Sequence, residues 1–239
     1  MLTVDFDRLD LQAGDRLLDL GCGEGRHCIN AFLLNEQVQA VGVDLGAQDL
    51  ATAQSRLGEF FPDADQPPGF GLCNANGLSL PFADNTFDKV ICSEVLEHIP
   101  DYQGMLAEID RVLKPDGLLA ISVPRAWPER ICWKLSAPYH LVKGGHIRIF
   151  NARALQADVN ALGLRRYARH WAHALHVPYW WLKCLFWEKR DDQPLINAYH
   201  KLLVWDLMDK PWLTRWLEKL LDPIMGKSVV MYFKRDASL

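Results

Sequence analysis

The sequence predicts an α/β protein with a doubly wound, mostly parallel sheet of seven strands and an aromatic-rich helical insertion before the last strand. Short apolar runs alternate with longer mixed segments through the first 125 residues, which is typical of βαβ units. A glycine-rich turn follows the first apolar run, as it does where such a sheet binds a ligand. All nine tryptophans lie after residue 126, so the second part of the chain differs in composition from the first.

Five apolar runs in the first part predict strands, and the mixed segments between them predict helices. The helix at 102–114 has its apolar residues at helical spacing and is followed by a Lys-Pro-Asp-Gly turn. Gly58 is expected to end the helix at 47–58. The predicted strands are 16–21, 38–45, 70–75, 87–94 and 117–124, and a further helix is expected at 25–35.

The segments beyond residue 124 are less regular. Residues 125–148 are predicted to form a long loop with one helix, and this loop leaves the carboxyl end of the fifth strand. A helix capped by Asn151 and ended by Gly163 follows. The sixth strand is predicted at 165–172 and the last strand at 227–235.

Residues 173–226 form the predicted insertion, and its three helical segments each begin with a proline. The third segment carries one apolar stripe. The residues of this stripe are Leu213, Trp216, Leu217, Leu220 and Leu221. The chain is therefore divided into a core (1–172 with 227–239), a substrate-side loop (125–148) and a helical aromatic cap (173–226).

Composition and sequence patterns argue against several classes of protein. The net charge of −4 argues against a nucleic-acid partner bound mainly through its phosphates. The chain has no run of 18 apolar residues, and its start lacks the pattern of a signal peptide. The six cysteines include no Cys-x-x-Cys pair, and the histidines show no metal-binding spacing. We therefore expect a cytoplasmic protein with reduced thiols and no metal site.

The turn after the first strand has glycines at 21, 23 and 25, between a strand and a helix. Asp19 lies two residues before the first of them and suits a cationic ligand better than a pyrophosphate. Asp44 ends the second strand, where a carboxylate can accept hydrogen bonds from ribose hydroxyls. These features indicate a nucleoside ligand, and for the loop alone a dehydrogenase remains the alternative.

Two further segments decide which nucleoside-containing cofactor the loop is expected to bind. "NGLSLPFADNTFDKVICSEVLEHIPD" and "EIDRVLKPDGLLAISVP" resemble the class I S-adenosylmethionine-dependent methyltransferases, which have a Rossmann-like fold. The most similar branch includes the ubiquinone and menaquinone biosynthesis methyltransferases. The resemblance covers residues 10–125, with a further, weaker similarity at "GGHIRIFNARAL". Four motifs occur in the family's order. It implies S-adenosylmethionine as the cofactor.

The resemblance also implies which residues contact the cofactor at the first two strands. Asp19 and the backbone of Gly21 and Gly23 would hold its methionine end. Asp44 would bind the ribose, and Leu45 would lie against the adenine.

The next two strands supply the remaining implied contacts. Asn76 occupies a position where the family usually has aspartate, and its amide oxygen can still accept from the adenine amino group. Gly77 would offer its backbone N–H to the ring. Ser93 and Glu94 would face the methionine moiety and the substrate.

We expect methyl transfer to oxygen or carbon. A hydroxyl or an acidic carbon must lose a proton in this reaction, so a general base would accelerate it. The candidates are His146, His98, His140 and Tyr139, with Glu129 behind them. His146 is the strongest candidate, because it follows a flexible Gly-Gly pair near the mouth of the fifth strand. Its alternative role is that of a loop histidine bonded to the backbone.

The aromatic cap is expected to cover the same sheet edge, and His173 and His176 could reach the site from it. Four roles are possible for the aromatic residues of the cap. They could pack among themselves, line a hydrophobic substrate pocket, make a peripheral membrane contact or form a homodimer interface. The sequence therefore favours a methyltransferase acting on a small, hydrophobic or lipid-like acceptor of quinone, prenyl, polyketide or glycolipid type. The alternative is a non-catalytic, cofactor-binding regulatory or scaffolding protein.

Overall fold

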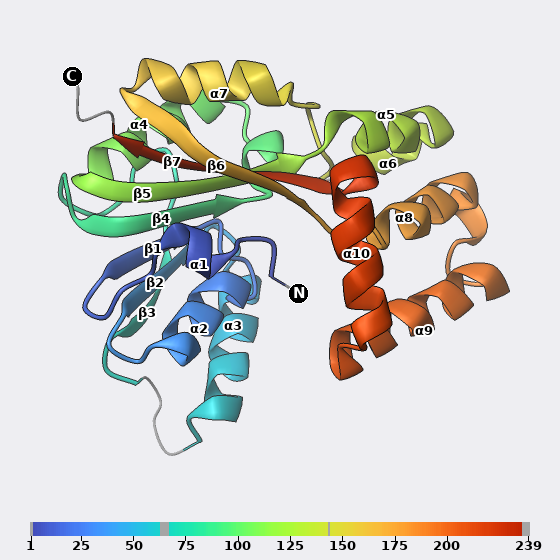
Figure 1. Cartoon of the computed structure of the whole chain (residues 1–239), viewed down its shortest axis with the longest axis horizontal. Coiled ribbons are helices and arrows are strands. Elements are labelled where there is room, and N and C mark those ends of the chain that lie inside the picture. The colour runs from blue at the N-terminus through green and yellow to red at the C-terminus, as the bar shows by residue number, and fades with distance from the viewer. Residues whose placement is uncertain (1, 63–66, 143, 236–239) are drawn as a thin grey trace.

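The computed structural model describes residues 2–62, 67–142 and 144–235. It shows a seven-stranded sheet in the order β3-β2-β1-β4-β5-β7-β6, in which only β7 runs antiparallel to its neighbours (Figure 1). The strands are β1 (Arg16–Leu20), β2 (Gln39–Asp44), β3 (Phe70–Asn74), β4 (Phe87–Ser93), β5 (Leu113–Pro124), β6 (Leu164–Ala172) and β7 (Ser228–Arg235). The predicted fold class is confirmed. Residue 143 of the predicted loop and residues 236–239 of the predicted core lie outside the described residues.

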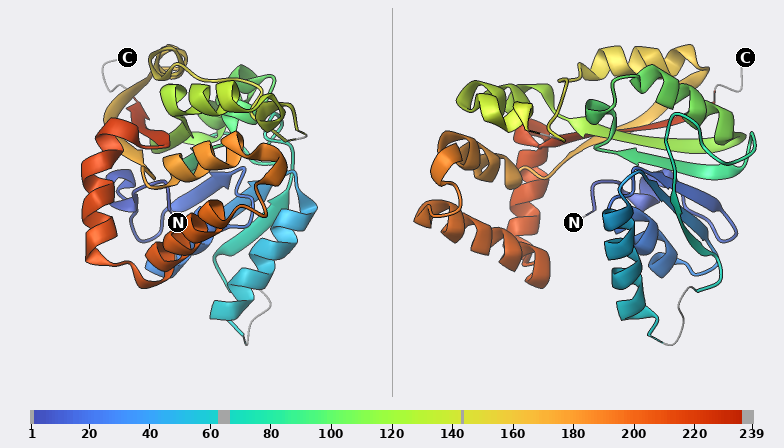
Figure 2. Two further views of the ribbon diagram at one scale, coloured as in Figure 1. Left: turned by 90° about the vertical axis from the view of Figure 1, so that its right-hand side faces the viewer. Right: turned by 180° about the vertical axis from the view of Figure 1, so that it is seen from behind.

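Helices cover both faces of the sheet (Figures 1 and 2). On one face α1 (Phe6–Leu9), α2 (Arg26–Leu34) and α3 (Ala47–Phe60) bury apolar side chains such as Phe32 and Leu57. On the other face α4 (Tyr102–Val112) and α7 (Ala152–Ala161) bury Ile109 and Leu155, among others. Because β1, β2, β4 and β5 are parallel, their carboxyl ends meet at one edge, beside the amino end of antiparallel β7.

Two predicted ends of helices were wrong. The helix α3 continues through Gly58 to Phe60, because one helical glycine costs only about 1 kcal/mol and Leu57 is buried beside it. The Lys-Pro-Asp-Gly segment belongs to β5 rather than to a separate turn. Phe87 pairs with Leu113 and Lys89 with Leu118, so residues 114–117 bulge from the strand opposite a single residue of β4.

The predicted loop at 125–148 contains two helices instead of one. These are α5 (Ala126–Leu135) and α6 (Ala137–Leu141), separated by Ser136 in an extended conformation. Pro138 lies in the first turn of α6, where its missing N–H is tolerated but where it could not continue α5. The loop is therefore a short helical wall beside the end of β5.

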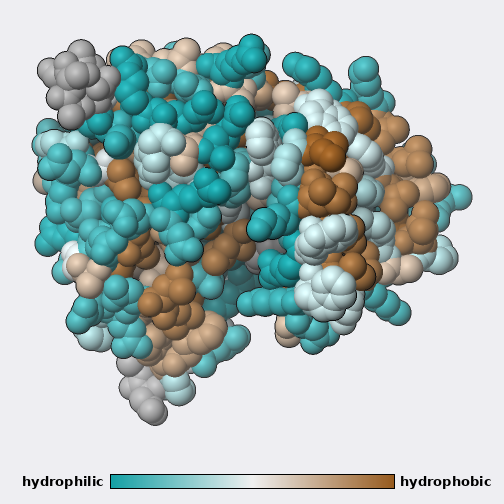
Figure 3. Space-filling view, in the orientation of Figure 1, coloured by the Kyte–Doolittle hydropathy of each residue, from teal (hydrophilic) through white to brown (hydrophobic). Residues whose placement is uncertain are grey.

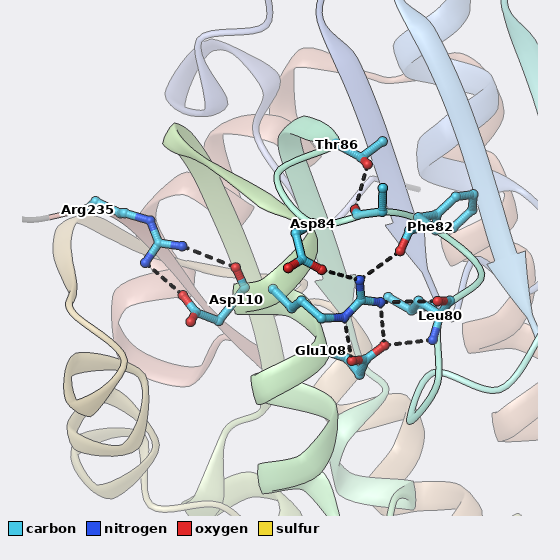
Figure 4. Close-up of polar contacts among 9 residues, drawn as sticks. Leu80, Phe82, Asp84, Thr86, Glu108, Asp110 and Arg235 are labelled. Atoms are coloured by element: carbon cyan, nitrogen blue, oxygen red, sulfur yellow. Dashed lines mark hydrogen bonds and ion pairs between the residues drawn. The ribbon is translucent and has the colours of Figure 1, made fainter.

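A half-buried guanidinium fixes the segment that leads from β3 to β4 (Figure 4). Arg111 of α4 donates to the carbonyl oxygens of Leu80 and Phe82 at 3.1 and 2.7 Å. It also pairs with Glu108, whose other oxygen accepts from the Leu80 N–H at 2.7 Å. These bonds anchor residues 80–84 to α4 and so position the Asn76–Gly77 turn just before them.

The predicted insertion lies before β7 and contains α8 (His176–Leu185), the 3₁₀ turn η2 (Trp187–Lys189), α9 (Pro194–Asp209) and α10 (Trp212–Met225). The helix α8 packs against α5, and α10 contacts β6 (Figure 2). Pro194 begins α9 as expected, whereas α8 begins two residues before Pro178 and α10 one residue after Pro211. Within the described residues, no helix combines the length and apolar character needed to cross a bilayer.

Candidate functional site

The glycine loop turns tightly after β1. Gly21, Gly23 and Gly25 have φ angles of +72°, +51° and +77°, which side-chain-bearing residues rarely adopt. The N–H groups of Gly21 and Cys22 both donate to the Val43 carbonyl, at 2.7 and 3.0 Å. A Cβ on Gly21 would overlap Val95, whereas a Cβ on Gly23 would meet no atom within 4 Å. Backbone bonds thus hold the loop to β2, and its open side at Gly23 leaves room for a ligand.

Asp44 fixes the same loop from the end of β2. One carboxylate oxygen accepts from the Gly23 N–H at 2.8 Å, and the other accepts from the Gly46 N–H at 2.7 Å. A carboxylate oxygen has two lone pairs, so each can accept a further bond from a ribose hydroxyl. The predicted ribose-binding residue therefore also organises the loop.

Asp19 is buried, whereas a side chain that contacts a bound ligand is usually partly exposed. It is 1% exposed, and it accepts from the Cys28 N–H in the first turn of α2 at 3.0 Å. Burial raises the pKa of its carboxyl group to about 7. Asp19 thus stabilises the start of α2, and its contact with the methionine end of a cofactor stays a prediction.

A small cavity of about 130 Å³ lies beside the loop. Its wall includes Gly21, Asp44, Leu45, Asn76 and Gly77, so the structure brings these five predicted residues together. Leu45 is 70% exposed and free to cover a ligand, and the Asn76 side-chain oxygen accepts from the Leu78 N–H at 3.0 Å. Apolar side chains complete the wall: Leu20, Val43, Ala75, Val95, Ile99 and Met105. A carboxylate at one end of a flat apolar slot fits the adenosine part of S-adenosylmethionine.

A larger cavity of about 560 Å³ opens between the core and the cap. Only two of its described lining side chains, Trp180 and Leu207, are apolar groups of the cap. The other lining residues are polar or charged: Thr3, Arg26, Arg56, Glu94, His173, His176, Lys227 and Ser228. His173 and His176 therefore reach the cavity as expected, but most of the cap's aromatic residues point elsewhere.

Glu94 follows β4 and lines the larger cavity. It has a φ of +57° at the end of β4, its carboxylate accepts from the Ser122 hydroxyl at 2.9 Å, and it lies 3.5 Å from the Lys227 ammonium. The Ser93 hydroxyl lies 2.8 Å from that of Ser122. Glu94 lines the larger cavity and Val95 the smaller one, so consecutive residues of the chain contribute to the two cavities.

The predicted base residues form a cluster around Glu129 of α5. His146 Nδ1 lies 2.6 Å from one Glu129 oxygen, and the Tyr139 hydroxyl donates to the other at 3.3 Å. Trp133 donates its indole N–H to Glu129 at 3.0 Å. Burial favours a raised pKa for Glu129, but the hydrogen bond and charge of His146 outweigh it and hold the pKa below its usual value. Glu129 therefore orients His146 and leaves Nε2 free.

His98 extends this cluster from η1 (Leu96–His98). Its ring lies 4.9 Å from the His146 ring, and its Nδ1 lies 3.3 Å from the Gly145 carbonyl oxygen. Burial, reinforced by the charge of Glu94, raises the pKa of Glu97 well above its usual value. Ligand atoms of Glu97, His98 and His146 lie within 4.8 Å of one another, so these three residues could hold a metal ion. Sequence spacing did not suggest this group, because its members meet only in the fold.

His140 lies beside the cluster but is not bonded to Glu129 in the described contacts. Its ring stacks on Trp133 at 4.1 Å, and its Nδ1 is buried without a partner. None of the four predicted base residues is among the described side chains that line the larger cavity. Lys227 was missed, although antiparallel β7 starts at the edge where the parallel strands end, which was the signal for it.

The sheet order and its helices define a Rossmann-like protein, and a small cavity lies at the glycine loop where the sequence predicts a nucleoside site. The family described as "Methyltransferase domain" matches residues 11–179, and the chain belongs to this family. The resemblance to class I S-adenosylmethionine-dependent methyltransferases is thereby confirmed.

Two curated relatives match the first part of the chain. One is 27-O-demethylrifamycin SV methyltransferase of Amycolatopsis mediterranei, 36% identical over 113 residues, which are 47% of this chain and 40% of the relative. The other is demethylmenaquinone methyltransferase of Corynebacterium urealyticum, 40% identical over 115 residues, which are 48% of this chain and 44% of the relative. The chain thus spans less than half the length of these curated relatives.

Solved structures show the same fold over nearly the whole chain. Geranyl diphosphate C-methyltransferase from Streptomyces coelicolor A3(2) has a TM-score of 0.63 and 18% identity, covering 97% of this chain and 78% of that one. The 4+2 cyclase SpnF has the same TM-score and identity, covering 96% and 78%. Because these two proteins are named for different activities on one fold, the acceptor has to be argued from the site itself.

Proposed function

We propose that this chain transfers a methyl group from S-adenosylmethionine to oxygen or carbon of a small acceptor bound in the larger cavity. The observation that carries the proposal is the junction at Glu94 and Val95. These consecutive residues line the small cavity of about 130 Å³ at the glycine loop and the larger cavity of about 560 Å³, which has room for an acceptor.

The chain's own residues would hold the cofactor at the glycine loop. Asp44 would accept from the ribose, the Gly77 N–H would face the adenine, and Leu45 would cover it. The bound cofactor supplies a methyl group activated by a sulfonium. The protein's contribution is then to align the acceptor with that group and to exclude water, which can account for about 7–11 kcal/mol of a reaction barrier.

The cavity lining suggests the character of the acceptor. Arg26, Arg56 and Lys227 lie on its wall, where they favour a polar or anionic group on the acceptor. Trp180 and Leu207 offer an apolar surface from the cap side. These features support a hydrophobic or lipid-like acceptor, of quinone, prenyl, polyketide or glycolipid type, that carries a polar end.

We assign the general base to His146, which lies outside the described lining of the larger cavity, so the acceptor would have to extend beyond that lining to reach it. Glu129 holds its Nδ1 at 2.6 Å, which fixes the tautomer that leaves Nε2 able to accept a proton. The same carboxylate would stabilise the imidazolium that forms when His146 takes the proton of an acceptor hydroxyl or acidic carbon. Tyr139 and His98 would act by positioning this pair.

Two measurements test the proposal in order. Isothermal titration should detect binding of S-adenosylmethionine to the full chain, and absence of binding would remove it. Release of S-adenosylhomocysteine should then be followed over a panel of quinones, prenyl compounds and lipids, with and without anionic groups. Cofactor binding without turnover on every compound would instead favour a regulatory or scaffolding protein.

A further inference from the structure

The outer face of α10 is apolar and exposed to solvent. Five side chains form this face, which we call the α10 stripe: Trp212, Leu213, Trp216, Leu220 and Ile224. Their exposed fractions range from 46% to 78%. Figure 3 shows a column of hydrophobic and pale side chains at the position of α10. Monomeric proteins rarely leave so continuous an apolar strip in water unless something binds to it.

The inner face of the same helix is polar. Thr214 and Glu218 are 5% and 8% exposed, and the Asp222 carboxylate accepts from the Ala174 N–H at 2.9 Å. The helix therefore turns its polar side toward the protein and its apolar side outward, which reverses the usual arrangement of a surface helix. This reversal is incompatible with a role for the α10 stripe in the core of this chain.

The neighbouring helix extends the apolar surface. At the end of α9, Trp205 and Met208 are 44% and 74% exposed, while Leu203 and Asp206 face inward. Because α9 connects directly to α10 through Pro211, these side chains lie near the start of the α10 stripe.

The charges on α10 are separated in the same way. Both basic residues, Arg215 and Lys219, are exposed and lie along one edge of the stripe, whereas both acidic residues are held on the inner face. Further cations lie near the end of the helix, where the guanidinium groups of Arg169 and Arg125 lie 4.6 and 5.4 Å from the Trp171 ring. The stripe thus has a basic border and no exposed acid from α10.

We propose that the α10 stripe docks on a lipid bilayer surface that carries anionic headgroups. Tryptophan and leucine beside basic residues suit the boundary between headgroups and acyl chains, where the indole rings insert and the cations meet lipid phosphates. Symmetric pairing of two copies through the stripe would instead bring Arg215 and Lys219 of both copies together without acidic partners. The inference goes beyond the proposed reaction, because docking requires neither cofactor nor acceptor.

Flotation of the full chain with lipid vesicles tests this inference. The protein should float with phosphatidylcholine vesicles that contain phosphatidylglycerol, and at least tenfold less with phosphatidylcholine alone. The double variant Trp216→Glu/Leu220→Glu should lose binding, because it places charges in the apolar stripe. Leu34→Glu, a change at an exposed leucine of α2, is the matched control and should float like the wild type.

A second pair of variants tests the electrostatic part. Arg215→Gln/Lys219→Gln should weaken binding to the anionic vesicles about tenfold or more, whereas Arg130→Gln/Arg153→Gln removes the same charge elsewhere and should have little effect. Circular dichroism would confirm that each variant is folded. Wild-type protein that does not float, or stripe variants that bind normally, would overturn the inference. So would a dimer, detected by sedimentation without vesicles, that Trp216→Glu/Leu220→Glu dissociates.

Discussion

Backbone hydrogen bonds hold much of the floor of the site, which we define as residues 21–25 with Asp44, whereas half-buried polar side chains hold the cap (173–226). In the floor, two N–H groups donate to Val43 and a third to Asp44. In the cap, the Ala174 N–H donates to the Asp222 carboxylate, and the Tyr199 hydroxyl donates to the Leu175 carbonyl at 3.0 Å. The cap therefore depends more on side-chain chemistry than the floor does.

The difference between floor and cap corresponds to two roles, which are cofactor binding and acceptor binding. The φ angles of the glycines and the pairing of β1 with β2 set the floor, so the position of a cofactor is determined locally. The acceptor side instead combines groups from β4, β7, α2, α3 and the cap. We therefore expect substitutions in the floor to change cofactor affinity, and substitutions near the cap to change turnover, membrane docking or stability.

The largest effect is expected at His146, beside the cap. His146→Ala should lower turnover by about 10²–10⁴-fold, because it removes the proposed base, and should leave the affinity for S-adenosylmethionine unchanged. Steady-state kinetics and isothermal titration measure the two quantities. His200→Ala, at an exposed histidine of α9, is the matched control. If His146→Ala weakened S-adenosylmethionine binding as strongly as it lowers turnover, the floor would not be the only region that sets cofactor affinity, and the proposed division between the two regions would be wrong.

A smaller effect is expected in the floor. Asp44→Ala should weaken S-adenosylmethionine binding at least tenfold, because it removes the acceptor of two loop N–H bonds and of the proposed ribose contact. Isothermal titration measures this change, and Asp116→Ala at the exposed bulge of β5 serves as the control. If the affinity stays the same, the ribose is bound elsewhere.

The sequence predicted the floor well because its signals are local. Five apolar runs marked the first five strands, two later segments marked the last two, and Asp44, Asn76 and Gly77 follow or end adjacent parallel strands. Residues at the carboxyl ends of such strands must share one edge, so their meeting in the small cavity could be inferred without coordinates.

The cap shows what a periodic pattern leaves undetermined. The predicted stripe does not face one environment: Leu213, Trp216 and Leu220 are exposed, whereas Leu217 and Leu221 are partly covered. Periodicity identifies which side chains share a helix face, but the environment of that face depends on distant contacts such as that of Asp222 with Ala174. The Glu129–His146 pair likewise required the position of α5, and the predicted loop had one helix without stating where it lies.

The smallest expected effect concerns the stability of the cap. Burial raises the pKa of Glu218 to about 7, with further increases from Asp222 and Asp206 and an opposing effect from Arg215. Between about pH 4.5 and pH 7 the folded chain therefore keeps a proton that the unfolded chain has lost. The free energy of unfolding must then fall as the pH rises through this window and become level above it.

Glu218→Gln removes this contribution, because an amide stays neutral at every pH in the window. The melting temperature of the wild type should drop between pH 5 and pH 8 by about 2–4 °C more than that of the variant. Asp19 and Asp222 also have raised pKa values, so part of the drop should remain in the variant. Glu59→Gln, at the exposed end of α3, should keep the full wild-type drop. If Glu218→Gln and Glu59→Gln give the same pH dependence, the Glu218 carboxyl is solvated, and the cap is not held by buried titratable groups in the way that distinguishes it from the floor.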